Sequence, residues 1–333
     1  NNYSGMSVEL LRGCPDSNMN YSDAGCDDYD RIAHMYICQG QCYETQYYGN
    51  ADEATCIEGG NSWDAEEGIC YSINYNDIAQ GECEEESTMD WEPNRECKEV
   101  ARWITPFRRQ PHHLTDISPL MAHVRPGGTK LVKFQESGWP NSLITMKLRF
   151  YHNTDNSPTA QEFIPIWNGT VQFNPDYADN RPPTPFIVPD NASKIEFVAL
   201  ITGHGWGNNT CYNCCEFCNS RHIFEVNGGT ANFNIDFPNA GATTYCMSPE
   251  MILEGTVPNQ YGTWGYGRAG WCPGLDVDPF VTDITDAVMI GDENIIDYEA
   301  CRVSGTSCLA PPTCGTCGYC PEVAFSSYIV IYY

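Results

Sequence analysis

Hydrophobic residues along the chain gather in short runs, and no segment sustains the spacing of three to four residues that marks an amphipathic helix. The runs are rich in β-branched and aromatic residues, and clusters of Gly, Pro, Asn and Asp separate them. This pattern predicts β-strands joined by turns. Examples of the expected strands are residues 32–37, 130–134, 144–151, 194–202, 222–227, 231–237 and 323–333.

Two of these runs also predict how their strands are buried. Residues 146–150 alternate between apolar and charged side chains, as a half-buried antiparallel strand does. Residues 328–332 do not alternate, so we expect that strand to be covered on both faces. Together with 22 Pro and 29 Gly, the pattern predicts an all-β fold of the β-sandwich or jelly-roll type.

The domain organisation follows from breaks in this pattern. A polar stretch at residues 153–160 separates two strand-rich halves, and we place the domain boundary there. The first domain is then residues 1–152 and the second residues 153–333. Within the first, residues 38–99 contain six regularly spaced cysteines, and Glu44 to Glu99 holds sixteen acids but only two bases. Few aliphatic residues remain there for a core, so we expect an acidic insertion held by disulfides.

Composition excludes several classes of protein. The chain of 333 residues has 17 Lys plus Arg against 44 Asp plus Glu, a formal charge of −27. Nucleic acids and anionic lipids attract basic surfaces, so neither is an expected partner. No apolar run reaches the roughly 20 residues of a membrane span, so we expect no membrane insertion. The 41% hydrophobic content is typical of a globular protein.

Nineteen cysteines predict an oxidising environment, and therefore a secreted or extracellular protein with about nine disulfides. The odd count leaves one thiol that is free or bonded to another chain. No signal peptide opens the sequence, so we expect Asn1 to be a processed or artificial start. Asn-x-Ser/Thr sequences, the acceptors of N-glycosylation, are compatible with secretion. They begin at Asn2, Asn20, Asn168, Asn191 and Asn208.

Metal sites were considered at two places. A cysteine knot at residues 301–320 contains Cys314-x-x-Cys317-x-x-Cys320, which also fits a zinc or iron–sulfur site. Disulfides are the better interpretation in an oxidised chain with no His nearby. His112-His113 would suit copper, but no His-x-His pair with a later Met accompanies it. We therefore expect neither a metal nor a cofactor.

Three segments combine charge, aromatic residues and Gly in a way that a plain sandwich does not require. In the first, Asp30 and Arg31 lead directly into an expected strand. In the second, a Gly-rich turn is followed by Cys214-Cys-Glu216-Phe-Cys218, where a disulfide would fix the Glu216 carboxylate. The third is a loop that offers Arg268 and Trp271 next to a Cys. Each also has a purely structural interpretation, namely a strand-cap ion pair, a hydrogen-bonded turn and a stacked pair bracing a loop.

Taken in this order, the segments resemble the bacterial-type peptide:N-glycanase F family, which releases N-linked glycans from Asn. The family pattern Asp-x-Trp-Asp-Arg is approximated by Asp28-Tyr29-Asp30-Arg31, and its Cys-Ala-Glu-Trp-Cys by residues 214–218. Its Arg-Ala-Gly-Trp-Cys-Pro-Gly block is matched from Arg268. Its Glu-x-Trp is approximated by Glu136-Ser-Gly-Trp139, with one extra residue. The resemblance covers most of the chain outside the acidic insertion.

The resemblance implies two jelly rolls packed side by side, with an active cleft at their interface. It implies catalytic roles for Asp30, Glu216 and Glu136. It implies that substrate, an N-glycan or glycopeptide, is bound by Arg31, Trp139, Arg268 and Trp271. It also implies disulfides Cys14–Cys26, Cys214–Cys218 and Cys246–Cys272.

The chemistry suits these residue types. Hydrolysis of a glycosylamide requires water to attack the amide carbon and the nitrogen to leave protonated, and carboxylates can serve both steps. Asp30 is the expected base. Like charge from Glu136 and Glu216 would raise its pKa and Arg31 would lower it, so the direction is left open. The predicted function is a secreted amidase that cleaves between Asn and N-acetylglucosamine.

Two departures from the family keep an alternative open. The family has strands upstream of the segment matched by residues 7–12, and the acidic insertion has no counterpart in it. A sandwich without its leading strands exposes a sheet edge, so either the missing piece was cut from this chain or another copy of the chain completes the edge by donating a strand. The alternative is therefore an extracellular filament or coat subunit that associates with copies of itself.

Overall fold

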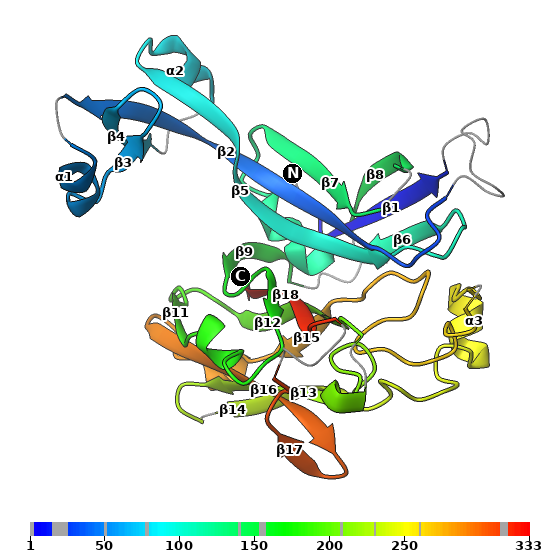
Figure 1. Ribbon diagram of the computed structural model, residues 1–333. Coiled ribbons are helices and arrows are strands. Elements are labelled where there is room, and N and C mark those ends of the chain that lie inside the picture. The colour runs from blue at the N-terminus through cyan, green and yellow to red at the C-terminus, as the bar shows by residue number, and fades with distance from the viewer. Residues whose placement is uncertain are drawn as a thin grey trace. The chain divides into compact units, whose positions relative to one another are not determined.

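The computed structural model describes residues 3–14, 26–49, 52–76, 80–138, 141–152, 158–206, 209–229, 231–259, 261–313 and 319–333. Two compact units divide the chain (Figure 1). One comprises residues 1–35, 99–125 and 134–333 and contains a second β-sandwich domain and part of a first. The other comprises residues 36–98 and 126–133 and is the disulfide-rich insertion. The all-β fold expected from the sequence is confirmed.

The first sandwich domain is built from strands in the N-terminal part of the chain. An antiparallel sheet has the order β6-β1-β8, and a second sheet has the order β3-β4-β2-β5 with β7 paired to β2. The strands are β1 Gly5–Gly13, β2 Ile32–Tyr48, β3 Ser62–Asp64, β4 Ile69–Asn76, β5 Met89–Ile104, β6 His112–Asp116, β7 Lys130–Glu136 and β8 Leu143–Tyr151. A 3₁₀ turn, η1 Ser118–His123, follows β6. β2 and β5 each contribute residues to both units.

The core of the first domain comes from side chains that point inward from these strands. Met6, Val8 and Leu10 alternate along β1 and are fully buried. Trp103 on β5 is also buried, and its indole nitrogen donates to the Thr115 hydroxyl of β6 at 2.9 Å. A buried Trp needs such a partner for its N–H group.

The second sandwich domain is built from two five-stranded sheets. One has the order β10-β18-β12-β15 with β9 paired to β18, and the other has the order β11-β16-β13-β14 with β17 paired to β16. The strands are β9 Ala160–Pro165, β10 Thr170–Gln172, β11 Thr184–Ile187, β12 Lys194–His204, β13 Ser220–Val226, β14 Ala231–Phe237, β15 Phe280–Asp283, β16 Glu293–Ser304, β17 Ser307–Leu309 and β18 Glu322–Tyr332. The short helical segments are η2 Ala178–Asn180, η3 Asn209–Cys211, α3 Pro249–Glu254 and η4 Thr285–Ala287.

β12 and β18 form the centre of this domain. Nearly every side chain along both strands is buried, so both faces of the sheet are covered. The continuous apolar run at residues 328–332 predicted this burial, and the prediction is confirmed. All seven strands expected from the sequence are present, with bounds within a few residues, although β2 is much longer than expected. β8 pairs antiparallel with β1, as expected, and alternates between half-buried and exposed positions up to its exposed last residues.

The two sandwich domains are joined by a buried polar network. Arg102 on β5 makes a bidentate ion pair with Glu99, at 2.8 and 2.7 Å, and donates across to the Thr202 hydroxyl of β12 at 2.8 Å. From β18, the Ser326 hydroxyl donates to Glu99 at 2.5 Å, and the Tyr328 hydroxyl donates to the Glu99 carbonyl at 2.7 Å. Each buried charge therefore has several partners, which such a pair requires to remain ionised.

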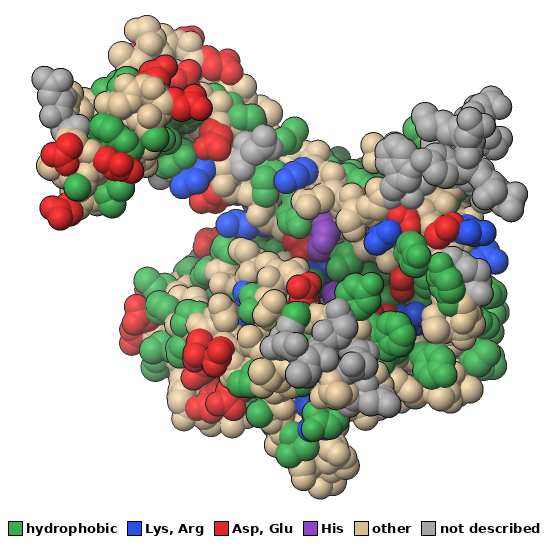
Figure 2. Space-filling view, in the orientation of Figure 1, with side chains coloured by type: hydrophobic (Ala, Val, Ile, Leu, Met, Phe, Trp, Pro, Cys, Tyr) green, Lys and Arg blue, Asp and Glu red, His purple; other side chains and the backbone are tan. Residues whose placement is uncertain are grey.

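The insertion unit contains two short helices, α1 Glu53–Glu58 and α2 Gln80–Glu85, packed with β3, β4 and the outer parts of β2 and β5. Figure 2 shows acidic side chains gathered over it. Its disulfides are nested: Cys38–Cys97 encloses Cys42–Cys83, which encloses Cys56–Cys70. The sequence predicted a disulfide-held insertion but not this connectivity, nor that residues 126–133 belong to it.

The remaining cysteines form pairs within the sandwich domains. The structure contains Cys14–Cys26, Cys214–Cys218, Cys246–Cys272 and Cys301–Cys308. Cys320 is also disulfide-bonded, whereas Cys314 and Cys317 lie outside the described residues. Cys215 is buried and is the free thiol among the described cysteines.

A search for membrane-spanning helices covered the same described residues. None of the helices there is long and apolar enough to cross a bilayer.

The nesting of the disulfides leads to a stability prediction. Replacing both Cys38 and Cys97 by Ser opens a loop with a sequence separation of 59 residues. Because Cys42–Cys83 still closes 41 of those residues, the outer disulfide adds a loop of 59 − 41 = 18 residues, and in the chain-entropy treatment its loss lowers the free energy of unfolding of the insertion by about 3 kcal/mol. Hydrogen exchange in increasing denaturant, followed over residues 36–98, measures the change. Replacing Cys301 and Cys308, separated by only 7 residues, should cost about 2 kcal/mol in its own domain. Equal losses in the two variants would contradict the prediction.

Candidate active site

The Asp30 and Glu216 side chains, far apart in the sequence, meet at the guanidinium group of Arg268. Arg268 Nε lies 3.0 Å from Glu216 Oε1, and Arg268 Nη2 lies 3.7 Å from Asp30 Oδ2. The Arg268 side chain is 2% exposed, whereas Asp30 and Glu216 retain 20% and 16%. Both carboxylates therefore keep some access to water while sharing one buried cation.

Local structure holds Glu216 in this place. The Cys214–Cys218 disulfide closes a tight turn around it. The Ala269 backbone N–H donates to the Glu216 carbonyl at 2.9 Å, which ties this turn to the Arg268 loop. Gly203 lies beneath, where a Cβ atom would stand 2.5 Å from the Cys215 carbonyl oxygen. Only Gly allows the strand and the turn to approach this closely.

Asp30 is held by the chain on either side of it. The Cys14–Cys26 disulfide lies four residues upstream. Downstream, the Arg31 N–H donates to the Thr105 hydroxyl at 2.8 Å, and the Thr105 N–H donates to the Arg31 carbonyl at 2.8 Å. Asp30 thus lies two residues before β2 and directly before Arg31, whose backbone is hydrogen-bonded to Thr105.

Burial and neighbouring charges change the acidity of both carboxyl groups. Burial raises the pKa of Glu216 from its ordinary value of 4.5 to about 7; Arg268 opposes the rise and the charge of Asp30 adds to it. Burial also raises the pKa of Asp30, against the opposing charges of Arg268 and Arg31. The direction that the sequence left open is therefore upward. Its main cause is loss of solvent rather than the like charge of Glu136.

Trp271 is part of the packing around Arg268. The Arg268 guanidinium lies over the Trp271 ring at 4.7 Å, and the His204 ring stacks on it at 5.4 Å. The indole N–H donates to the Gly203 carbonyl at 2.9 Å. Arg268 and Trp271 are both buried, so they form the stacked pair that the sequence raised as the structural interpretation, and Arg268 orients the two carboxylates.

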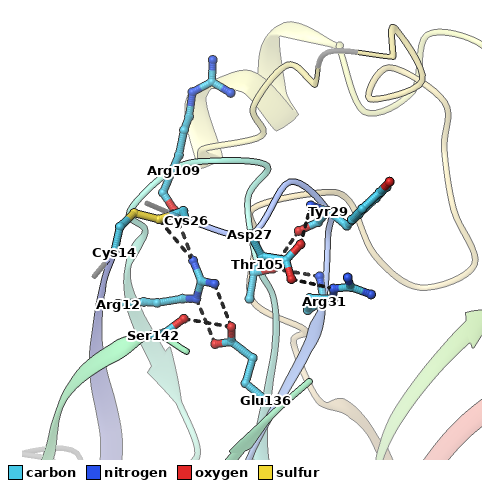
Figure 3. A network of polar contacts seen from close by, with 10 residues as sticks. All are labelled: Arg12, Cys14, Cys26, Asp27, Tyr29, Arg31, Thr105, Arg109, Glu136 and Ser142. Carbon is cyan, nitrogen blue, oxygen red and sulfur yellow. Dashed lines mark hydrogen bonds and ion pairs between the residues drawn. A yellow bond between two sulfur atoms is a disulfide. The ribbon is translucent and has the colours of Figure 1, made fainter. Parts of the chain in front are cut away.

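Glu136 lies in a neighbouring network (Figure 3). Its carboxylate makes a bidentate ion pair with buried Arg12 of β1, at 2.9 and 2.7 Å, and accepts from the Ser142 hydroxyl at 2.9 Å. Arg12 also donates to the Arg109 carbonyl at 3.3 Å. The structure therefore joins Glu136 to β1, whereas the resemblance had grouped it with Asp30 and Glu216.

Arg31 is oriented by a second ion pair in the same view. Its Nε lies 3.1 Å from Asp27 Oδ2, and Asp27 also accepts from the Tyr29 N–H at 2.8 Å (Figure 3). Gly138, in the loop after Glu136, packs against this pair, since a Cβ atom there would lie 2.5 Å from Asp27 Oδ2. Trp139, expected to face the sugar, lies outside the described residues.

Exposed aromatic rings near the carboxylates were not singled out as site residues in the sequence. Tyr29, next to Asp30, is 47% exposed and stacks on Tyr261 with ring centres 5.8 Å apart. Trp206 is 58% exposed and pairs through its backbone with Cys215, the residue before Glu216. Exposed aromatic rings provide flat apolar faces for a sugar ring. Tyr29 directly precedes Asp30 in the sequence, which was the available clue to that ring, whereas Trp206 is brought to the Glu216 turn only by folding.

The expected glycosylation sites can be located in part. Asn168 and Asn191 are exposed, while Asn2, Asn20 and Asn208 lie outside the described residues. Among the described residues, no group of three or more His, Cys, Asp and Glu could hold a metal ion. His112 pairs with Glu9 at 2.9 Å.

Chemically, the site combines a partly hydrated carboxyl group, a second carboxyl group that remains protonated up to about neutral pH, and a buried cation between them. Two carboxyl groups whose environments separate their protonation states can divide the roles of base and acid.

Comparison with known proteins gives results for sequence and for structure. Residues 172–314 match the family described as Peptide-N-glycosidase F, C terminal. The matched residues include Glu216 and Arg268, but not Asp30. A search of the curated proteins gave no match.

Several solved structures share the whole fold. A crystal structure of peptide-N(4)-(N-acetyl-β-D-glucosaminyl)asparagine amidase superposes with a TM-score of 0.58 at 17% identity, covering 99% of this chain and 85% of that one. The glycosylasparaginase PNGase F from Flavobacterium meningosepticum gives 0.57 at 16% identity, with the same coverage. PNGF-II gives 0.60 at 14% identity; 99% of this chain aligns with 57% of the longer PNGF-II. Residues 172–314 are therefore similar in sequence to the C-terminal part of peptide-N-glycosidase F, and the chain shares its fold with solved structures of peptide:N-glycanase F.

Proposed function

We propose that the protein hydrolyses the amide bond between Asn and N-acetylglucosamine in N-glycoproteins. The observation that carries the proposal is the convergence of Asp30 and Glu216, one from each sandwich domain, on the buried Arg268. A folded scaffold has no need to place two raised-pKa carboxyl groups in one partly hydrated place, and such groups cluster at functional sites. The similar structure of peptide-N(4)-(N-acetyl-β-D-glucosaminyl)asparagine amidase adds support from the shared fold.

The chemical steps divide between the two carboxyl groups. Asp30, ionised, accepts a proton from a water molecule as the water oxygen bonds to the side-chain amide carbon of the substrate Asn. The tetrahedral intermediate collapses by breaking the bond between that carbon and the glycosidic nitrogen. Glu216, protonated, donates its proton to the departing nitrogen. The products are an Asp side chain and a glycosylamine, and solvent returns the proton from Asp30 to Glu216.

Arg268 and Glu136 have positioning roles in this proposal. Arg268 fixes the separation of the two carboxyl groups and limits how far the pKa of each rises. Glu136, paired with Arg12, fixes the start of the loop that leads through Gly138 to Trp139. A sugar contact for Trp139, which lies outside the described residues, rests on the resemblance alone.

The substrate-binding surface combines charge with flat rings. Arg31 is about one-third exposed and can donate hydrogen bonds to sugar hydroxyls while Asp27 holds it in place. Tyr29 is exposed next to Asp30 in the sequence, Tyr261 stacks on it, and exposed Trp206 pairs through its backbone with Cys215. They supply apolar faces for the C–H side of a sugar ring.

Secretion fits the same proposal. At least seven disulfides form within the described residues, and such pairs persist in oxidising compartments. N-glycoproteins are abundant outside the cell, and Asn168 and Asn191 are themselves exposed acceptor sequences. The comparisons provide no support for the alternative of a filament or coat subunit, since the similar structures described above are of peptide-N-glycanase type.

Activity can be tested on a defined N-glycopeptide by mass spectrometry. Wild-type protein should release the glycan and convert the glycosylated Asn to Asp. Asp30→Asn should lower kcat by at least about a hundredfold, because general base catalysis typically contributes 10²–10⁴. Its unfolding temperature should not fall, because Arg268 keeps Glu216 as a partner and burial already disfavours the charged form of Asp30.

Glu136→Gln serves as the contrasting variant. It leaves Arg12 buried without a counter-charge, and breaking a buried pair typically costs about 3–5 kcal/mol of stability. Its unfolding temperature should therefore fall while residual activity per folded molecule exceeds that of Asp30→Asn. Intact glycopeptide after prolonged incubation with wild-type protein would refute the amidase.

The raised pKa values lead to a specific pH dependence of kcat/KM. The rate should rise with pH as Asp30 loses its proton and becomes a base. It should fall above pH of about 7 as Glu216 loses the proton that the leaving nitrogen needs. Glu216→Gln should be slow and should lack the alkaline fall, measured as initial rates across the pH range. An unchanged alkaline fall in this variant would show that another group is the acid.

A further inference from the structure

A cavity of about 560 Å³ opens within the insertion unit, separate in composition from the carboxylate site. It is lined by parts of β2, β4, β5 and α2 and by the turn that leads into β7. Cavities of roughly 300–1,000 Å³ are the size that holds small organic ligands. The family resemblance does not extend to this insertion.

The lining differs from the rest of the unit in its charge. The unit as a whole contains fifteen acids and four bases. Of the twelve described residues that line the cavity, four carry side-chain amides, four are Gly, and only Glu96 and Lys130 are charged. The lining is thus neutral overall and dense in groups that both donate and accept hydrogen bonds, which suits a neutral ligand with many hydroxyl groups.

Trp91 supplies the aromatic surface of this cavity. A Cβ atom at Gly40 would lie 2.3 Å from the Trp91 ring, so the indole packs directly on the Gly40 backbone. Trp91 is nevertheless only half-buried. A held aromatic ring beside amide side chains is the combination that recognises sugars, because the ring packs on C–H groups while the amides bind hydroxyls.

Other lining residues leave polar groups accessible from the cavity. Lys130 Nζ donates to Gln39 Oε1 at 2.7 Å, which orients the amide and occupies the cation. Gly127 and Gly128 have positive φ angles, and nothing lies within 4 Å of the place where a Cβ atom would be built on either. Backbone groups at this turn are therefore accessible to a ligand.

We propose that this cavity is a second carbohydrate site, which binds a neutral oligosaccharide of hexose or N-acetylhexosamine units. Cations are disfavoured as ligands because Glu96 is the single carboxylate among the described lining residues. Anions are disfavoured because the single ammonium group, that of Lys130, is already hydrogen-bonded to Gln39. An apolar peptide would meet mainly amides and glycines. Such a site would hold the protein on glycans without taking part in catalysis. The proposal can therefore be tested separately from the amidase activity.

Gly81 and Gly49 provide a matched pair of variants for the test. Gly81 lines the cavity on α2, and nothing lies within 4 Å of a Cβ atom built on it, so Gly81→Trp introduces a bulky ring at the cavity wall. Gly49 in the same unit is equally unhindered but does not line the cavity, so Gly49→Trp is the control. Trp91→Ala removes the aromatic surface.

Calorimetric titration of the full chain with N,N′-diacetylchitobiose and with mannotriose tests the proposal. Asp30→Asn protein is used throughout, so that turnover cannot interfere. At least one neutral probe should bind, with a Kd that rises about tenfold or more in Gly81→Trp and in Trp91→Ala and is unchanged in Gly49→Trp.

Three outcomes would overturn the proposal. The first is that neither neutral saccharide binds. The second is that the Kd is the same in Gly81→Trp and in Gly49→Trp, which would place binding in the carboxylate site. The third is that only an acidic saccharide, such as a heparin disaccharide, binds at the cavity. If folded wild-type protein does not hydrolyse the glycopeptide, the proposed amidase activity is refuted, but the proposed carbohydrate site in the cavity is not.

Discussion

The guanidinium group of Arg268 is the interaction on which the carboxylate site depends. It is buried against Trp271 and Phe217, and it contacts a carboxyl group from each sandwich domain. A single buried cation cannot fully compensate two buried anions, so one carboxyl group remains protonated at higher pH than usual. The raised pKa values that the proposed hydrolysis needs thus come mainly from burial of the two carboxyl groups, which the single cation opposes only in part.

Asp30 and Glu216 can share Arg268 only if the two sandwich domains keep a fixed relative position. The Glu99–Arg102 pair stabilises that position through its hydrogen bonds to β12 and β18. The same strands connect this network to the site, because Thr202 also contacts His204, which stacks on Trp271. Burial lowers the pKa of His204 to about 3, and the nearby Arg102, His34 and Arg268 charges add to this, so its ring is neutral. The site is therefore supported by a neutral aromatic stack rather than by a further charge.

The sequence predicted much of the fold, because the pattern of apolar and polar residues along a strand is local. The continuous apolar run at residues 328–332, for example, predicted a strand that is buried on both faces. The motifs also predicted that Asp30, Glu216 and Arg268 belong to one site. They could not place Glu136, since its partner Arg12 lies 124 residues away, and long-range pairing leaves no local pattern. Nor could spacing reveal that Trp271 is buried rather than exposed to a sugar, or that the insertion's glycines and amides line a cavity. Those depend on tertiary packing.

The most direct test of the account is a titration of the Glu216 carboxyl group, followed by ¹³C NMR of labelled Glu and assigned with Glu216→Gln. We predict that it titrates near pH 7 in the wild type. Its pKa should fall in Asp30→Asn, which removes a like charge, and rise in Arg268→Met, which removes the cation. Titration at the ordinary value of 4.5, unmoved by Asp30→Asn, would contradict the claim that the two carboxyl groups share one buried site.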